Sequence, residues 1–245
     1  MTKLTFEKNR TWVILGATSI IAEEFAKLAA QAGYSLLLVG RDKAQLDIIK
    51  ADVCLRFRIN CKTLICDFSN DLNEILAHFE SFREEIDLFI AFSSIVENTN
   101  LNQSNIENLI KVNALATVQL IYAYLHKAQS EHRLIFLSSV AACRGRAKNS
   151  LYGGSKAFVE VYLEGLQQEA SKKLNITIAR LGFIDTAQTY GQPGIFYASP
   201  PKACAEACWK ALFAGKRLIY HPFFWRFIML IIRNLPFFIY KKMKL

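Results

Sequence analysis

The stretch Thr11-Trp-Val-Ile-Leu-Gly16-Ala-Thr-Ser-Ile-Ile-Ala22 decides the fold. Its first six residues are mostly apolar and end at a glycine, which predicts a buried strand followed by a tight turn. Residues 20–33 then have the apolar spacing of an amphipathic helix that stops at Gly33. A strand, a glycine turn and a helix in this order are typical of a dinucleotide-binding unit.

The same alternation continues along the chain. Strand and helix patterns follow one another through seven predicted strands, the last at residues 217–220. This alternation indicates an α/β fold, with a doubly wound parallel sheet and helices on both of its faces. The 245 residues contain no repeat, low-complexity run or linker, so a single domain suffices. We predict that domain over residues 1–221 and an amphipathic C-terminal tail over residues 222–245.

An acid/base site is predicted by Ser139, Tyr152 and Lys156. Residues four apart lie on one face of a helix, so the Tyr152 phenol and the Lys156 ammonium are expected to share a pocket. A phenol has an ordinary pKa of about 10, which a neighbouring cation lowers toward the range of general acid/base catalysis. Ser139 ends an apolar run, residues 134–139, and this predicts a strand whose tip presents a hydroxyl to a carbonyl substrate.

These residues resemble the active site of the short-chain dehydrogenase/reductase family. The resemblance runs from about residue 10 to residue 220 and adds Asn113, which lies 39 residues before Tyr152. It implies a single-domain Rossmann fold, in which Tyr152 exchanges a proton with the substrate oxygen and Ser139 holds that oxygen. It further implies that Lys156 binds the nicotinamide ribose and tunes the tyrosine, and that Asn113 anchors a proton-relay water.

The glycine-rich turn of that family corresponds to residues 16–22. The resemblance implies cofactor contacts at Gly16, Thr18, Ser19 and Ile21. Ile20 and Ala22 replace two of the three family glycines. Ala22 is small enough for the helix to pack on the strand, but Ile20 stands where a bare backbone lets the pyrophosphate approach. The amides at the helix N-terminus remain available to a phosphate.

The second predicted strand ends at Arg41, which favours NADP over NAD. Arginine can pair with a 2′-phosphate, whereas an acidic residue here would bind the 2′-hydroxyl of NAD. Asp42 is interpreted as a helix N-cap, because Gln45 follows three residues later. The resemblance implies an adenine contact at Asp67 and nicotinamide contacts at Ile184 and Thr186.

Two further segments border the predicted site. Ala91-Phe-Ser-Ser94 stands where the family has asparagine, asparagine, alanine and glycine. Residues 189–201 are rich in glycine and proline and are predicted to form a substrate lid. Its aromatic residues suggest an apolar or sugar-stacking wall, and they are Tyr190, Phe196 and Tyr197.

Most of the net charge of +9 lies after Glu206, the last acidic residue. Eight basic residues follow it, which leaves 22 basic against 21 acidic residues in the rest of the chain. The tail is also rich in aromatic residues, but its apolar run 227–232 is far shorter than the ~20 residues that span a bilayer. We expect it either to lie in an anionic membrane interface or to pack on the enzyme or a second subunit. Nucleic-acid binding is disfavoured because the rest of the chain is nearly neutral.

The turn at residues 16–22 and the tail resemble a branch of the family that reduces decaprenylphosphoryl keto-sugars. This implies a polyprenyl-linked or other lipidic ketone, so we predict an NADPH-dependent ketone reductase. One alternative is a reductase of a soluble steroid-like or fatty ketone, with the tail as a dimer element. Another is a non-catalytic nucleotide-binding scaffold. A homo-oligomer is predicted through helices at about residues 102–129 and 150–173, by resemblance to the family.

The six cysteines include neither a CxxC pair nor a histidine cluster, so no metal site is predicted. Residues 1–10 are polar and do not resemble a secretory signal. A reducing, cytoplasmic setting is therefore expected, with the tail at the inner face of the membrane if it binds lipid.

Overall fold

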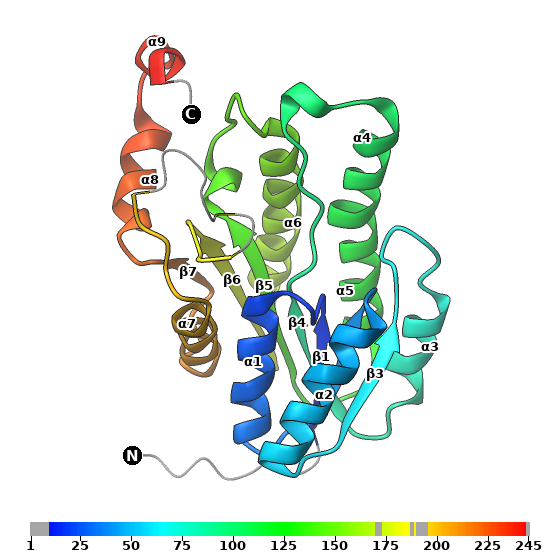
Figure 1. Ribbon diagram of the computed structural model, residues 1–245. Coiled ribbons are helices and arrows are strands. Elements are labelled where there is room, and N and C mark those ends of the chain that lie inside the picture. The colour runs from blue at the N-terminus through cyan, green and yellow to red at the C-terminus, as the bar shows by residue number, and fades with distance from the viewer. Residues whose placement is uncertain (1–9, 170–172, 187–188, 190–195, 244–245) are drawn as a thin grey trace.

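The computed structural model describes residues 10–169, 173–186, 189 and 196–243 (Figure 1). Their seven strands form one parallel sheet in the order β3-β2-β1-β4-β5-β6-β7. The predicted α/β class and doubly wound parallel sheet are confirmed. The strands are β1 (Arg10–Leu15), β2 (Ser35–Gly40), β3 (Cys61–Ile65), β4 (Glu85–Ile90), β5 (His132–Ser139), β6 (Leu174–Leu181) and β7 (Leu218–His221).

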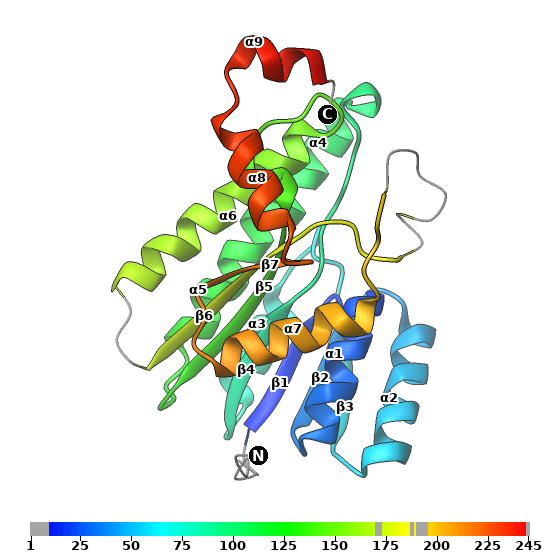
Figure 2. The same ribbon diagram turned by 90° about the vertical axis from the view of Figure 1, so that its left-hand side faces the viewer.

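Helices cover both faces of this sheet (Figures 1 and 2). They are α1 (Ile20–Gln31), α2 (Lys43–Phe57), α3 (Asn73–Ser81), α4 (Gln103–Ile110), α5 (Thr117–His126), α6 (Ser150–Glu169), α7 (Pro201–Phe213), α8 (Trp225–Asn234) and α9 (Phe237–Tyr240). Successive residues of β1 point to opposite faces, since Trp12 and Ile14 belong to the core under α1, α2 and α7. Val13 and Leu15 belong to the core under α3, α5 and α6. Burial on both faces explains why the strand reads as a continuous apolar run.

The strand order reverses at β1. The chain runs outward from β1 to β2 and β3, and then crosses back to place β4 on the other side of β1. In open α/β sheets, ligands bind beyond the carboxyl ends of the strands at such a switch point. The residues that follow β1, β4 and β5 therefore meet at one edge of the sheet.

A π-helical segment, Lys111–Ala116, joins α4 to α5. The Thr117 hydroxyl donates to the carbonyl of Val112, five residues back, at 3.3 Å. Such wide turns are frequent at functional sites. Asn113 lies within this segment and is buried.

The tail folds back onto the same edge of the sheet. Trp225 and Met229 are buried against Val140, directly after β5. Trp225 also fills the space beside Gly182, where an added Cβ would lie 1.8 Å from the indole Nε1. Figure 2 shows α8 and α9 at the end of the molecule to which the strands point. Among the described residues, no helix has the length and apolarity needed to cross a membrane.

Candidate active site

The turn after β5 and the start of α6 bring Tyr152 to Ser139. Ser139 is the last residue of β5, and Tyr152 lies in the first turn of α6. Gly153 permits the close approach of the two elements, because a Cβ there would lie 2.5 Å from the Ala141 carbonyl oxygen. The side chains of Ser139 and Ser93 lie close enough to the Tyr152 phenol to act on its pKa. The predicted serine and tyrosine are thus brought together, with the tyrosine ring buried beside Leu109 and Ala141.

Burial raises the pKa of Tyr152 above its ordinary value. The hydroxyls of Ser139 and Ser93, and then the charge of Arg146, oppose this rise. The cation whose charge lowers the pKa of the phenol is Arg146, and the expected effect of Lys156 on this pKa stays a prediction. Lys156 lies over the face of the tyrosine ring, with Nζ 6.0 Å from the ring centre. Its ammonium is itself destabilised by burial.

The Lys156 side chain is held beneath the site. Its Nζ donates to the Leu137 carbonyl at 2.9 Å and lies 4.7 Å from the centre of the Phe136 ring. Burial lowers the pKa of Lys156 to about 7, although the charge of Glu160, one turn along α6, acts in the opposite direction. The ammonium is therefore poised to lose its proton near neutral pH.

This lowered pKa predicts a pH-dependent stability. The unfolded lysine has a pKa of about 10.4, so between about pH 7 and about pH 10 the unfolded chain binds more protons at Lys156 than the folded chain does. The free energy of unfolding should then rise with pH, by up to about 1.4 kcal/mol per pH unit, relative to that of Lys156→Met. Denaturant unfolding of both proteins across this range measures the difference. A difference that stays constant with pH would contradict the prediction.

A buried ion pair fixes α6 against β5 and β6. Arg180 binds both carboxylate oxygens of Glu160, with Nη2 to Oε2 at 2.6 Å and Nε to Oε1 at 3.1 Å. The Ser138 hydroxyl donates to Oε1 of the same carboxylate at 2.5 Å. Arg180 also donates to the Tyr220 hydroxyl on β7 at 2.8 Å. Ser138 precedes Ser139, and Glu160 follows Lys156 by one turn, so this network sets the position of the catalytic groups.

Asn113 ties the π-helical segment to β4 and α6. Its side-chain oxygen accepts from the Ser94 amide at 2.7 Å, and its side-chain nitrogen donates to the Ser94 carbonyl at 2.8 Å. The same nitrogen donates to the Ser155 hydroxyl at 3.0 Å. Asn113 therefore holds the segment after β4, which carries Ser93, close to the helix that carries Tyr152.

The turn after β1 is built around Gly16. Its φ is +81°, and a Cβ at this position would lie 2.6 Å from the Phe92 amide nitrogen. Only glycine meets both conditions without displacing the backbone. Phe92 in turn stacks on Phe68, with ring centres 3.9 Å apart. The segment at residues 91–94, which differs from the family, thus supports the turn with the aromatic side chain of Phe92.

The start of α1 is the place where the sequence predicts a phosphate contact. Ser19 precedes the helix without capping it through its side chain, so the first amides of α1 lack that partner. Thr18 is exposed, Ile20 is 46% exposed, and Ala22 is fully buried as helix packing requires. The Ile21 side chain is buried in the core, which leaves only its backbone amide to meet a cofactor.

The groups expected to hold the adenosine lie after β2 and β3. Arg41 is exposed, and its charge reaches Asp67 and lowers the pKa of that carboxyl. The larger cause of that lowering is a backbone hydrogen bond from Ser69. Asp42 accepts from the Gln45 amide at 3.0 Å, which confirms that it is an N-cap. Exposed arginine, free helix amides and the glycine turn together fit a phosphorylated dinucleotide.

The predicted nicotinamide contacts are partly engaged within the chain. The Thr189 hydroxyl donates to the Ile184 carbonyl at 2.5 Å and accepts from the Thr186 amide at 3.0 Å. A carboxamide bound to these groups would have to replace that hydroxyl. Tyr190 of the predicted lid lies outside the described residues, whereas Phe196 and Tyr197 lie within them.

Sequence reasoning missed two arginines in the turn between β5 and α6. Arg146 is partly buried, and the charge interactions that act on it come from Tyr152, Cys143 and Tyr240 of the tail. Arg144 donates to the Leu235 carbonyl at 2.9 Å and to the Ile232 carbonyl, and it lies 3.9 Å above the Tyr240 ring centre. No local pattern marks Arg144, because its hydrogen-bond partners in the tail are about 90 residues away in the sequence.

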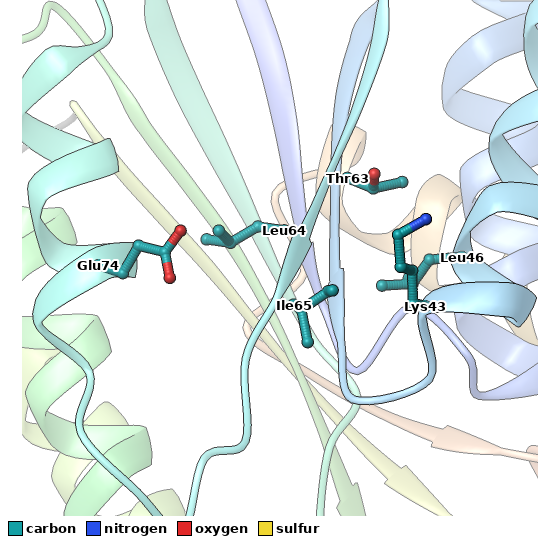
Figure 3. Close-up of a pocket in the computed structure, with 6 residues that line it drawn as sticks. All are labelled: Lys43, Leu46, Thr63, Leu64, Ile65 and Glu74. Carbon is teal, nitrogen blue, oxygen red and sulfur yellow. The ribbon is translucent and has the colours of Figure 1, made fainter.

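Two surface hollows lie apart from these groups. One, of about 360 Å³, straddles edge strand β3, and Figure 3 shows Lys43, Leu46 and Thr63 on one side and Leu64 and Glu74 on the other. A second, of about 550 Å³, lies between α3 and α5. Neither hollow contains a predicted site residue, so the site is defined by its chemistry and not by these cavities.

Comparison with known proteins identifies the family. Residues 10–192 match the short chain dehydrogenase family, and the chain belongs to it. An uncharacterized oxidoreductase of Staphylococcus epidermidis is 27% identical over 202 residues, which cover 75% of this chain and 82% of that protein. A very-long-chain 3-oxoacyl-CoA reductase of Neurospora crassa is 25% identical over 175 residues, which cover 67% of this chain and only 53% of that protein.

Solved structures show the same fold. A bulky-bulky ketone specific alcohol dehydrogenase from Comamonas testosteroni superposes with a TM-score of 0.78 at 20% identity, covering 86% of each chain. A short-chain dehydrogenase from Sphingobium yanoikuyae in complex with NADPH gives a TM-score of 0.78 at 21% identity, covering 87% of this chain and 88% of that one.

Proposed function

We propose that this protein is an NADP(H)-dependent reductase that converts an apolar, lipidic ketone to an alcohol. The observation that carries the proposal is the Tyr152 phenol, which is buried and lies close enough to the Ser139 and Ser93 hydroxyls for them to lower its pKa. It lies at the carboxyl edge of a parallel sheet, where the Gly16 turn and the start of α1 suit a dinucleotide.

In this proposal each polar group has one role. Bound NADPH supplies a hydride to the carbonyl carbon. Tyr152 donates its phenolic proton to the carbonyl oxygen, and its raised pKa keeps that proton in place until then. Ser139 positions the same oxygen by hydrogen bonding. Lys156 returns a proton toward Tyr152 as it titrates near neutral pH, and Asn113 holds the two sides of the site together.

The preference for NADPH rests on Arg41. It is exposed at the end of β2, and no ion pair is formed by it within the described part of the chain. A guanidinium in this place can bind a 2′-phosphate through two parallel hydrogen bonds. The Sphingobium yanoikuyae structure, which contains NADPH, has the same fold and so supports the choice.

Calorimetric titration with NADPH and with NADH tests the cofactor assignment. We expect NADPH to bind more tightly, and Arg41→Ser to weaken NADPH binding about 10-fold or more while NADH binding stays unchanged, since a bond to a charged group contributes roughly 1.5–3 kcal/mol. Lys62→Ser, an exposed cation on the neighbouring strand β3, serves as the matched control. Folded wild-type protein that binds neither nucleotide would favour the scaffold alternative.

The substrate class is supported by the relatives and by the tail. The Neurospora crassa relative is named for a very-long-chain substrate and the Comamonas testosteroni structure for bulky ketones. Phe196 and Tyr197, both exposed, pack beside Phe224 and offer an apolar wall. A polyprenyl-linked keto-sugar is the narrower proposal, supported by the turn at residues 16–22 and the tail. A soluble steroid-like or fatty ketone is the alternative, and turnover by protein without lipid present would favour it.

Assembly and location are also proposals. Tyr122 on α5 and Phe158 and Val161 on α6 are more than half exposed, which supports a homo-oligomer through these helices. Sedimentation that shows only a monomer would contradict it. The six cysteines form no disulfide, which fits a reducing cytoplasmic compartment.

A further inference from the structure

The tail presents an apolar and basic surface. Eight apolar side chains between residues 223 and 243 are 41% to 71% exposed, and they are Phe223, Phe227, Leu230, Ile231, Phe237, Phe238, Ile239 and Met243. Four exposed cations lie among them, namely Arg226, Arg233, Lys241 and Lys242. We call these twelve residues the tail surface. Contiguous apolar surface of this kind marks an interaction site.

Helix α8 is apolar on two opposite sides. Trp225 and Met229 face inward and are buried on the enzyme. Phe227, Leu230 and Ile231 face outward and are 57%, 62% and 64% exposed. A helix that is apolar nearly all round requires a second apolar partner. The enzyme is the first partner, and the described part of the chain does not provide the second.

The charge of the tail surface indicates what this second partner is. No acidic residue follows Glu206, and the four cations of the tail surface form no ion pair with any residue that the structure describes. A two-fold contact between copies would bring the same surface of each together, and so would oppose cations to cations. An anionic lipid interface offers an apolar layer and negative head groups at once. We propose that the tail surface docks the protein on an anionic membrane.

The attachment of the tail sets the orientation of the docked enzyme. Arg144, five residues after Ser139, binds the carbonyls at the end of α8, and the Tyr240 hydroxyl donates to the Gly145 carbonyl at 2.6 Å. Phe196 and Tyr197 of the lid lie against Phe224, with ring centres 5.7 Å and 5.9 Å apart. The membrane would therefore lie beside the entrance to the active site. This orientation rests on the proposed function and means that the ketone enters from the bilayer, whereas docking itself does not depend on it.

Vesicle flotation tests the docking. We expect wild-type protein to float with vesicles of phosphatidylcholine plus phosphatidylglycerol, to bind phosphatidylcholine alone weakly, and to dissociate as salt rises. Leu230→Ser/Ile231→Ser should weaken binding about 10-fold or more, because two buried apolar side chains are lost. Arg226→Gln/Arg233→Gln should weaken binding to anionic vesicles about 30-fold and reduce the preference for them.

The chain offers a matched control on α2. Ile48→Ser/Leu55→Ser changes the same two residue types at positions that are 62% and 84% exposed. We expect this variant to float as the wild type does. Equal losses in both serine variants would overturn the proposal, as would wild-type protein that does not float. A dimer that Leu230→Ser/Ile231→Ser dissociates, in protein indifferent to lipid, would assign the tail surface to a second copy instead.

Measurements of turnover distinguish membrane docking from catalysis. Leu230→Ser/Ile231→Ser should reduce a short soluble ketone at the wild-type rate, because neither residue lies in the catalytic site. With a long-chain ketone embedded in anionic vesicles, the rate of reduction by the same variant should fall about 10-fold or more, because the variant binds the membrane more weakly. Equal rates on the embedded ketone would overturn the orientation. Flotation without any ketone reduction would overturn the proposed function and leave docking in place.

Discussion

Tyr152→Phe is expected to lower kcat by about 10²-fold to 10⁴-fold, the usual contribution of a positioned general acid. The substitution removes only the hydroxyl that lies near Ser139 and Ser93, and the ring remains packed against Leu109 and Ala141. NADPH binding should change less than about threefold, a small shift on the affinity scale. Steady-state kinetics with a ketone, together with calorimetric titration of the cofactor, measures both quantities.

Tyr162→Phe is the matched control, because Tyr162 lies on the same helix, and burial also raises the pKa of its phenol. This variant should keep wild-type turnover. Full activity in Tyr152→Phe would contradict the proposed mechanism. A loss of turnover shared by both variants would point to damage to α6 and not to a missing acid.

Arg180→Met is expected to lower the free energy of unfolding by about 3–5 kcal/mol, the effect of breaking a buried ion pair from one side. Glu160 would keep its charge, yet it would lose a partner that binds both of its oxygens and retain mainly the Ser138 hydroxyl. Urea unfolding followed by circular dichroism measures the loss. Turnover should fall as well, because Glu160 and Ser138 position Lys156 and Ser139.

The double variant Glu160→Met/Arg180→Met makes this prediction specific. When both charges are replaced by apolar groups, no buried charge is left without a partner, and stability should return to within about 1–2 kcal/mol of the wild type. A double variant as unstable as Arg180→Met would mean that packing, and not the unpaired carboxylate, accounts for the loss. A loss below about 1 kcal/mol in Arg180→Met would refute the importance of the pair.

The sheet could be predicted because its signals are local. The apolar run of β1 and the glycine that follows it are both visible within a few residues of sequence, and the alternation of strands and helices then indicates a parallel sheet, as β1 forms with β2 and β4. Asp42 as an N-cap has the same origin, since its partner Gln45 is three residues away. Tyr152 and Ser139 could be paired because the resemblance supplied their spacing.

The rest of the site depends on contacts between distant segments. The hydrogen bonds of Arg144 to the tail arise only once the 140–146 turn and α8 pack together. The pKa of Lys156 also could not be predicted from the spacing of a tyrosine and a lysine, because it depends mainly on burial. Spacing identifies which groups share a pocket, whereas the surrounding protein decides their protonation.

The contact between Trp225 and Gly182 has a consequence for hydration of the substrate site. The indole occupies the space beside a glycine that lies two residues before Ile184, so part of the tail would form a wall on the side where the nicotinamide is predicted to bind. A chain that ended at residue 221 would expose backbone there, and water could then enter where a closed reductase excludes it. The tail would thus exclude water from the reaction as well as position the enzyme on the membrane. Substitutions on its inner face and on its outer face would therefore affect activity in different ways.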